Sequence, residues 1–302
     1  MKRPIPWPDM RIYCPNRSIM LLRPQASSCP APSIKKGKPM RLDMDYCGSC
    51  LRGITDQLAS RAGGCTSDAR GMIERVQDAN HWARHSLESA LAHAYPLVRW
   101  AHSEREEGGS EHATEGFNWV YDPIDGAYHF LQGLPLWSSS LALVENGRTI
   151  AALVYDPAAG EMFTATAGAG AFSGERRLSA SNRTALDGAV VSTTMPSFAF
   201  DGKEATDATI ASITKIVPEV FSLRIMASSS LQLAYVAAGR LDAYWSLDGD
   251  VNDWLAGALL AREAGAYVAN SVPSELAFGD TEVLAAAPAL AGPISKLLWG
   301  IG

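Results

Sequence analysis

A short acidic turn placed directly after an apolar run constrains this chain more than any other feature. The run Asn118-Trp-Val-Tyr121 indicates a buried strand, and it leads into Asp122-Pro-Ile-Asp125-Gly126. Because proline fixes φ at about −65° and lacks an N–H group, the chain is expected to turn there and to direct both carboxylates toward one point. The same five residues also form ordinary surface turns. The preceding strand favours a ligand site, since α/β proteins bind ligands at the carboxyl ends of strands and hard cations prefer clustered oxygens.

A second acidic feature lies far downstream, where residues 252–265 predict a helix with an apolar face and a glycine stop. Asp253 falls in its first turn. An acidic residue there usually serves as a cap that the helix dipole favours. Together with the first motif, it is also a candidate for a remote metal ligand.

The remaining pattern predicts strands that alternate with helices beside a continuous antiparallel meander, which is typical of a layered α/β sandwich. A short, weak helix is expected at 54–61, and an amphipathic helix at 72–95 ends before Pro96. The strands at 138–144 and 149–155 flank Asn146-Gly147, the best short hairpin signal. Further elements follow the chain in order: strands at 161–166 and 170–172, a strand at 189–192, a helix at 207–217, a helix at 230–238 and a strand at 239–245.

Three motifs in one order give the chain a family resemblance. Asp122-Pro-Ile-Asp125-Gly, the stretch from Glu161 to Phe172, and Asp253-x-x-Ala256-Gly257 resemble the inositol monophosphatase family of magnesium-dependent, lithium-sensitive phosphatases. The resemblance covers about residues 75–300. It implies an α-β-α-β-α sandwich over residues 51–302, with a metal-binding half at about 72–185 and a second α/β half at about 186–302.

The resemblance also implies a set of oxygen ligands for two or three magnesium ions: Glu104, Asp122, the carbonyl of Ile124, Asp125 and Asp253. Four carboxylates in one place would repel each other and raise each other's pKa values unless cations neutralise them. Glu106 is the alternative to Glu104. Backbone N–H groups of Gly126 and Ala127 are expected to contact the phosphate, which needs no particular side chain there.

Two positions depart from the family pattern at the groups that orient the attacking water. Ala127 stands where the family has a threonine, and Asn80 stands where it has an aspartate. Tyr128 and His129 are candidates for a replacement proton acceptor. If His129 is the base, the activity is expected to fall below pH of about 6.5, the ordinary histidine pKa.

The expected substrate contacts also differ from those of inositol-specific members. Arg224, Ser228 and Ser230 lie in the region where the family contacts its substrate. Ser246 follows Tyr244-Trp245 where inositol-specific members carry a glutamate, so a hydroxyl acceptor is missing. This disfavours myo-inositol 1-phosphate as the substrate.

Two functions from different classes therefore stay open. The first is a magnesium-dependent phosphomonoesterase that acts on a small phosphorylated polyol, sugar or nucleotide. The second is a catalytically impaired member that binds metal and phosphate or acts as a regulatory protein. Bisphosphate nucleotidases and fructose bisphosphatases share the Asp-Pro-x-Asp-Gly core and form a third alternative. A homodimer is expected by analogy, with an exposed Trp137 as a candidate contact.

Charge and cysteine content bound the location and the partners. The net charge of −6 gives no reason to expect nucleic acid or a membrane surface as a partner. Residues 1–50 form a basic, proline-rich extension that is expected to be disordered or to precede the true translation start. All five cysteines lie within residues 1–65, so the enzyme-like part needs no disulfide. Cys47-Gly-Ser-Cys50 lacks a partner motif and is interpreted as incidental. A reducing, cytoplasmic location follows as an expectation.

Overall fold

The computed structural model describes residues 42–64, 68–101, 115–272, 276 and 280–300, all within the compact unit 32–302. Seven α-helices lie in this part: α1 Met44–Ala59, α2 Ala69–Ala92, α3 Ala127–Gln132, α4 Phe198–Ile216, α5 Ser229–Ala237, α6 Val251–Glu263 and α7 Pro288–Trp299. A short 3-10 helix, η1, spans Leu186–Gly188. None of the helices described is both long and apolar enough to cross a bilayer.

The strands form two sheets. The first has the order β1-β2-β3-β4-β5-β6-β7, and only β1 and β2 pair in parallel. Its strands are β1 Arg99–Trp100, β2 Phe117–Asp125, β3 Ser138–Glu145, β4 Arg148–Asp156, β5 Glu161–Thr166, β6 Gly170–Ser173 and β7 Arg176–Arg177. The second sheet has the order β11-β12-β10-β8-β9, with parallel pairing of β10 with β8 and of β8 with β9. Its strands are β8 Val190–Thr193, β9 Ser222–Ile225, β10 Ala243–Ser246, β11 Tyr267–Ala269 and β12 Val283–Ala286.

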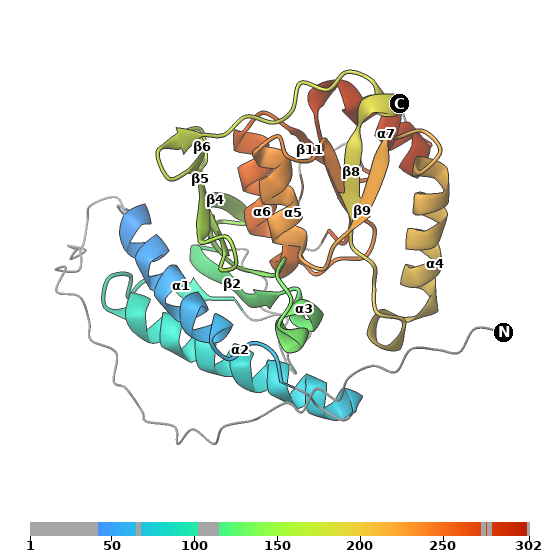
Figure 1. Ribbon diagram of the computed structural model, residues 1–302. Coiled ribbons are helices and arrows are strands. Elements are labelled where there is room, and N and C mark those ends of the chain that lie inside the picture. The colour runs from blue at the N-terminus through green and yellow to red at the C-terminus, as the bar shows by residue number, and fades with distance from the viewer. Residues whose placement is uncertain (1–41, 65–67, 102–114, 273–275, 277–279, 301–302) are drawn as a thin grey trace, which may run out of the picture. The chain divides into compact units, whose positions relative to one another are not determined.

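Helices and sheets alternate in five layers (Figure 1). Helices α1 and α2 cover one face of the first sheet, α5 and α6 lie between the two sheets, and α4 and α7 cover the far face of the second sheet. The central layer is almost entirely buried; Trp254 and Leu260 of α6, for example, are 1% and 0% exposed. The α-β-α-β-α sandwich is therefore confirmed.

The first helix differs from the expectation. In place of a short helix at 54–61, α1 begins at Met44, after Asp43 accepts a hydrogen bond from the N–H of Tyr46 at 2.9 Å. Its buried face repeats every three to four residues: Cys47, Leu51, Ile54 and Leu58. The expected boundary at residue 50 therefore falls inside α1. Burial raises the pKa of the Cys47 thiol to about 12, which disfavours thiolate chemistry there.

Other local expectations are confirmed. Helix α2 matches the helix expected at 72–95, and strands β3 and β4 form the expected hairpin. Asn146 and Gly147 join these strands with φ values of 50° and 80°, as a tight hairpin turn requires.

Trp137, in contrast, is only 3% exposed, and its ring packs edge-on against Phe130 at 5.3 Å. Trp137 is therefore a core residue, and the expectation that it is exposed was wrong.

Candidate active site

Strand β2 ends in a bulge that carries the first two aspartates. Asp122 pairs with Ser140 and Asp125 pairs with Ser138. Between these two pairs β2 advances by three residues and β3 by only two, so β2 carries one extra residue, as in a β-bulge. Pro123 lies inside this irregularity, where a ladder hydrogen bond is not needed. The N–H of Ile124 donates to Oδ1 of Asp122 at 3.0 Å. The expected turn is thus a bulge within the strand, and it re-aims the side chains that follow it.

Asp125 is held by the first turn of α5. Its Oδ2 accepts from Oγ of Ser228 and from the N–H of Ser230, both at 2.7 Å, and its Oδ1 accepts from the N–H of Ser229 at 3.1 Å. Asp125 as a whole is 5% exposed. Burial raises the pKa of Asp125 to about 6, although these hydrogen bonds oppose the shift. A carboxylate at a helix N-terminus also interacts favourably with the helix dipole.

Asp122 lies close enough to the other aspartates for their charges to act on it. Burial raises the pKa of Asp122 well above its usual range, and Asp253 and Asp125 raise it further. Asp253 comes from the first turn of α6, which Asp250 caps by accepting from the N–H of Asn252 at 3.0 Å. The structure therefore brings Asp122, Asp125 and Asp253 to one region, from segments far apart in the sequence.

Helix α3 begins immediately after the aspartates. Gly126 has a φ of 98°, in the left-handed region that favours glycine. A Cβ atom on Gly126 would lie 3.0 Å from Cβ of Trp137. The N–H groups of a helix's first turn have no partner inside the helix, and in α3 these belong to the expected phosphate-binding residues, Gly126 and Ala127.

Tyr128 and His129 follow on α3 in different settings. Tyr128 is 62% exposed. Nδ1 of His129 lies 3.2 Å from the carbonyl oxygen of Leu136. If Nδ1 carries the proton and donates to this carbonyl, Nε2 is the acceptor nitrogen of the neutral ring.

The other predicted residues occupy varied environments. Arg224 is exposed on β9, and its Nη1 donates to Oγ of Ser222 and to the carbonyl of Leu223. Ser246 is buried at the end of β10. Asn80 is half-buried on α2, and its Oδ1 has no hydrogen-bond partner within the part of the chain that the structure describes. Glu104 and Glu106 lie outside the described residues.

Two hydroxyl pairs that the sequence did not single out support this region. Oγ of Ser138 lies 2.9 Å from Oγ of Ser228, and the hydroxyl of Tyr244 donates to Oγ of Ser229 at 2.8 Å. The available signals were the serine runs at 138–140 and 228–230. A serine run is common in loops, however, and it contains no signal for which distant residue each hydroxyl contacts.

The donors gathered here suit a hard cation. Carboxylates of three aspartates and the carbonyl of Ile124 are the oxygen ligands that magnesium prefers. Oδ1 of Asp125 accepts one hydrogen bond from Ser229 and retains acceptor capacity. Within the described ranges, no three His, Cys, Asp or Glu side chains lie close enough to hold an ion by themselves. The residues fit magnesium by the chemistry of their oxygen donors, and Glu104, the further predicted ligand, lies outside the described residues.

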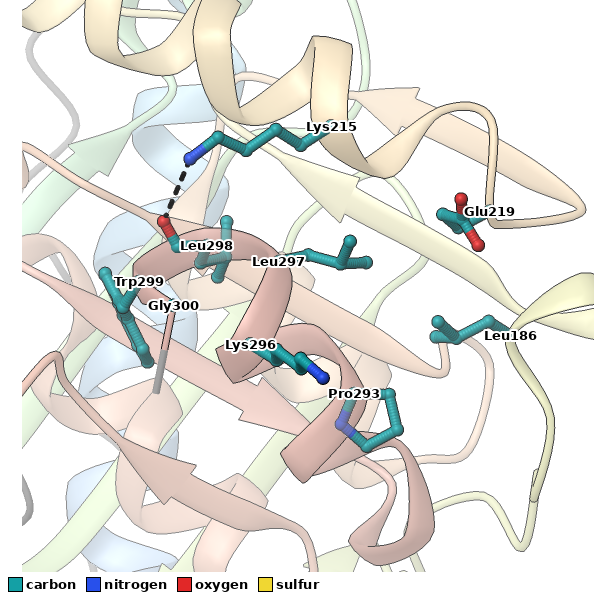
Figure 2. Close-up of a pocket in the computed structure, with 9 residues that line it drawn as sticks. All are labelled: Leu186, Lys215, Glu219, Pro293, Lys296, Leu297, Leu298, Trp299 and Gly300. Atoms are coloured by element: carbon teal, nitrogen blue, oxygen red, sulfur yellow. Dashed lines mark hydrogen bonds between the residues drawn. The ribbon is translucent and has the colours of Figure 1, made fainter. Parts of the chain in front are cut away.

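A surface pocket of about 610 Å³ lies elsewhere, between α4, η1 and the end of α7 (Figure 2). Nζ of Lys215 donates to the carbonyl of Leu298 at 3.4 Å, and Lys296 and Glu219 also line the pocket. None of the predicted site residues lines this pocket. The aspartate region, not this groove, is the candidate active site.

The five layers and the aspartates at the end of β2 define an α-β-α-β-α sandwich with a carboxylate site. The sequence model of the inositol monophosphatase family matches residues 51–302. The chain therefore belongs to the inositol monophosphatase family, as the motifs predicted.

Individual proteins agree with this assignment. The chain is 37% identical over 199 residues to the inositol-1-monophosphatase of Rhizobium meliloti, and the aligned region covers 66% of this chain and 73% of that protein. It is 36% identical over 199 residues to the Nus factor SuhB of Xylella fastidiosa, covering 66% of this chain and 70% of that protein. The crystal structure of the extragenic suppressor protein suhB from Bartonella henselae superposes with a TM-score of 0.70 and 27% identity, covering 84% of this chain and 97% of that one.

Proposed function

We propose that this protein is a magnesium-dependent phosphomonoesterase that hydrolyses a small phosphorylated polyol, sugar or nucleotide. Family membership supports a phosphatase function. The observation that carries the proposal is that the aspartate-bearing ends of β2 and α6 meet: Ser230 donates to Oδ2 of Asp125 at 2.7 Å and to the carbonyl of Asp253 at 2.6 Å, and the charge of Asp253 acts on Asp122. Crowded, desolvated carboxylates are unfavourable unless they are protonated or neutralised by a cation.

In this proposal the ligands are Glu104, Asp122, the carbonyl of Ile124, Asp125 and Asp253. Bound magnesium, as two or three ions, would lower the pKa of a coordinated water and neutralise charge on the phosphate. The chain's own residues position the ester. The first N–H groups of α3, at Gly126 and Ala127, donate to phosphate oxygens, because a helix N-terminus favours an anion.

Proton transfer needs a new acceptor in this chain, because Ala127 and Asn80 cannot act as a threonine–aspartate pair. His129 is one candidate, with Nδ1 beside the Leu136 carbonyl and Nε2 as the acceptor nitrogen. Tyr128 is the other, although a tyrosine phenol is a weak acceptor at neutral pH.

Substrate selection is proposed to involve Arg224 and Ser246 directly, and Ser228 and Ser230, which are buried, through their hydrogen bonds to Asp125. Ser246 is a neutral hydroxyl where inositol-specific members carry a glutamate. A substrate hydroxyl would therefore meet a weaker acceptor, which disfavours myo-inositol 1-phosphate. We further propose a homodimer in a reducing, cytoplasmic location, where the free thiols on α1 would persist.

The second candidate is a metal- and phosphate-binding or regulatory protein with impaired catalysis. Two observations favour it: the loss of the water-orienting pair at Asn80 and Ala127, and the similarity to a protein named Nus factor SuhB. Retained ligands are compatible with both functions. Turnover distinguishes them.

Phosphate release from a panel of inositol, sugar and nucleotide monophosphates tests the proposal. We expect release that requires magnesium, is inhibited by lithium, and falls about 10²–10³-fold in Asp253→Asn, since that variant loses one stabilising charge. Circular dichroism confirms that the variant is folded. Magnesium binding without any release would instead support the regulatory protein.

A further inference from the structure

Three consecutive serines at the start of α5 each bond to a different layer of the fold. Oγ of Ser228 contacts Asp125 on β2, in the first sheet. Oγ of Ser229 accepts from Tyr244 on β10, in the second sheet. Ser230 makes the third connection, to α6. The first turn of α5 is therefore a joint between both sheets and the helix that carries Asp253.

Ser230 is the member that touches both aspartate-bearing segments. Its N–H donates to Oδ2 of Asp125 at 2.7 Å, and its Oγ donates to the carbonyl of Asp253 at 2.6 Å. The residue is 0% exposed. A buried hydroxyl without a partner is costly, and the Ser230 hydroxyl finds its acceptor in the Asp253 carbonyl while lying close enough to Asp125 to help lower the pKa of that carboxyl.

Close packing of the two helices independently brings Ser230 near α6. Gly257 has no side chain where α6 meets α5, and a Cβ atom there would lie 2.5 Å from Cβ of Leu233 and 3.0 Å from the carbonyl oxygen of Ser230. Packing at Gly257 sets the distance between the helices. Asp253 lies four residues, about one helical turn, before Gly257 on the same helix.

We propose that Ser230 is a positioning residue that ties the first turn of α6 to the Asp125 anchor and so sets the mutual placement of Asp253 and Asp125. The inference rests on the proposed function for its catalytic consequence. Residues that orient metal ligands without touching the metal typically change metal affinity by about 10–100-fold when removed. Ser230 has this relation to both expected ligands, through its N–H and its hydroxyl.

The variants Ser230→Ala and Ser230→Cys of the full chain test whether the Ser230 hydroxyl holds the first turn of α6 in place. Alanine removes the hydroxyl and leaves the N–H bond to Asp125, whereas cysteine keeps a weak donor of similar size. Thr55→Val is the matched control: Thr55 is 0% exposed, and its hydroxyl donates to the carbonyl of Leu51 at 2.8 Å on α1. It removes a buried hydroxyl-to-carbonyl bond outside the site.

Two readouts are needed. Amide hydrogen exchange without magnesium should rise about tenfold at residues 253–257 in Ser230→Ala, less in Ser230→Cys, and not at all in Thr55→Val. Calorimetric titration with magnesium chloride should show affinity reduced by about tenfold in Ser230→Ala, in the same order across the variants. In turnover, KM for magnesium should rise more than kcat falls.

Exchange and magnesium affinity equal to those of Thr55→Val would overturn the role of Ser230. If exchange rises while magnesium affinity is unchanged, the Ser230 hydroxyl stabilises the first turn of α6 but does not position a metal ligand, and the inference fails. If the parent protein binds no magnesium, the proposed function fails, and the exchange comparison alone decides whether Ser230 holds the first turn of α6.

Discussion

The hydroxyl of Ser228 donates to Oδ2 of Asp125 at 2.7 Å, which joins the start of a central helix to the end of a strand in the first sheet. Asp125 thus anchors α5 and is also an expected metal ligand. Because its pKa is raised to about 6, its protonation falls within the pH range of ordinary assays. The first prediction follows from this relationship.

Magnesium should stabilise the protein more at pH 7.5 than at pH 5. With a folded pKa of about 6 against an unfolded value of about 3.9, the metal-free folded state binds this proton more tightly, so its free energy of unfolding falls as pH rises through that window. Asp122 acts in the same direction. Magnesium at about 100 times its Kd should raise Tm by roughly 5–10 °C at pH 7.5 and by less at pH 5, where protons compete. Thermal unfolding measures both values, and equal shifts at the two pH values would contradict the prediction.

Restoring the family's water-orienting pair should accelerate hydrolysis. Asn80 lies on α2 and Ala127 begins α3, and these two helices pack against each other. The double variant Asn80→Asp with Ala127→Thr should raise kcat by about 10²–10⁴-fold, the usual contribution of a positioned acid or base. Each single change should give much less, because the hydroxyl and the carboxylate act as a unit. A double variant no faster than the parent would show that this chain orients its water by other groups.

The role of His129 is decided by the pH–rate profile. If His129 accepts the proton, His129→Gln lowers kcat/KM by about 10²-fold and removes any fall of kcat/KM on the acid side of the parent's profile. Tyr128→Phe serves as the parallel variant for the neighbouring candidate. If kcat/KM of the parent is flat from pH 5 to 8, His129 is not the proton acceptor, and its role is the structural contact of Nδ1 with the carbonyl of Leu136.

A side chain at Gly126 should destabilise the fold more than backbone strain alone explains. Gly126→Ala places a methyl group 3.0 Å from Cβ of Trp137 at a φ of 98°, whereas Gly147→Ala has a φ of 80° and open space around it. The second variant isolates the strain of a positive φ. Chemical denaturation should give a free energy of unfolding about 1–3 kcal/mol lower for Gly126→Ala than for Gly147→Ala, the usual cost of overpacking. Equal losses of unfolding free energy in the two variants would mean that Trp137 moves aside for the added methyl group at no energetic cost.

Several features of this protein were determined by the sequence alone, because they depend on neighbours within a few residues. The Asn146-Gly147 hairpin follows from two residues that accept positive φ, and α2 follows from an apolar repeat of three and four. The motif at Asp122 to Gly126, together with Asp253 and Gly257, was enough to predict the family and the layered sandwich.

The tertiary structure decided which of these pieces meet. Nothing local indicates that Asp125 receives its hydrogen bonds from Ser228, Ser229 and Ser230, since a helix N-terminus accepts any nearby anion and the pairing depends on how the layers pack. Trp137, beside Pro135, was expected to be exposed, yet packing against Phe130 buries it. Local propensity acts over one or two turns of chain, whereas the partners of a buried carboxylate or ring are chosen by contacts between distant segments. For that reason the sequence identified the aspartates, and only the fold showed what holds them.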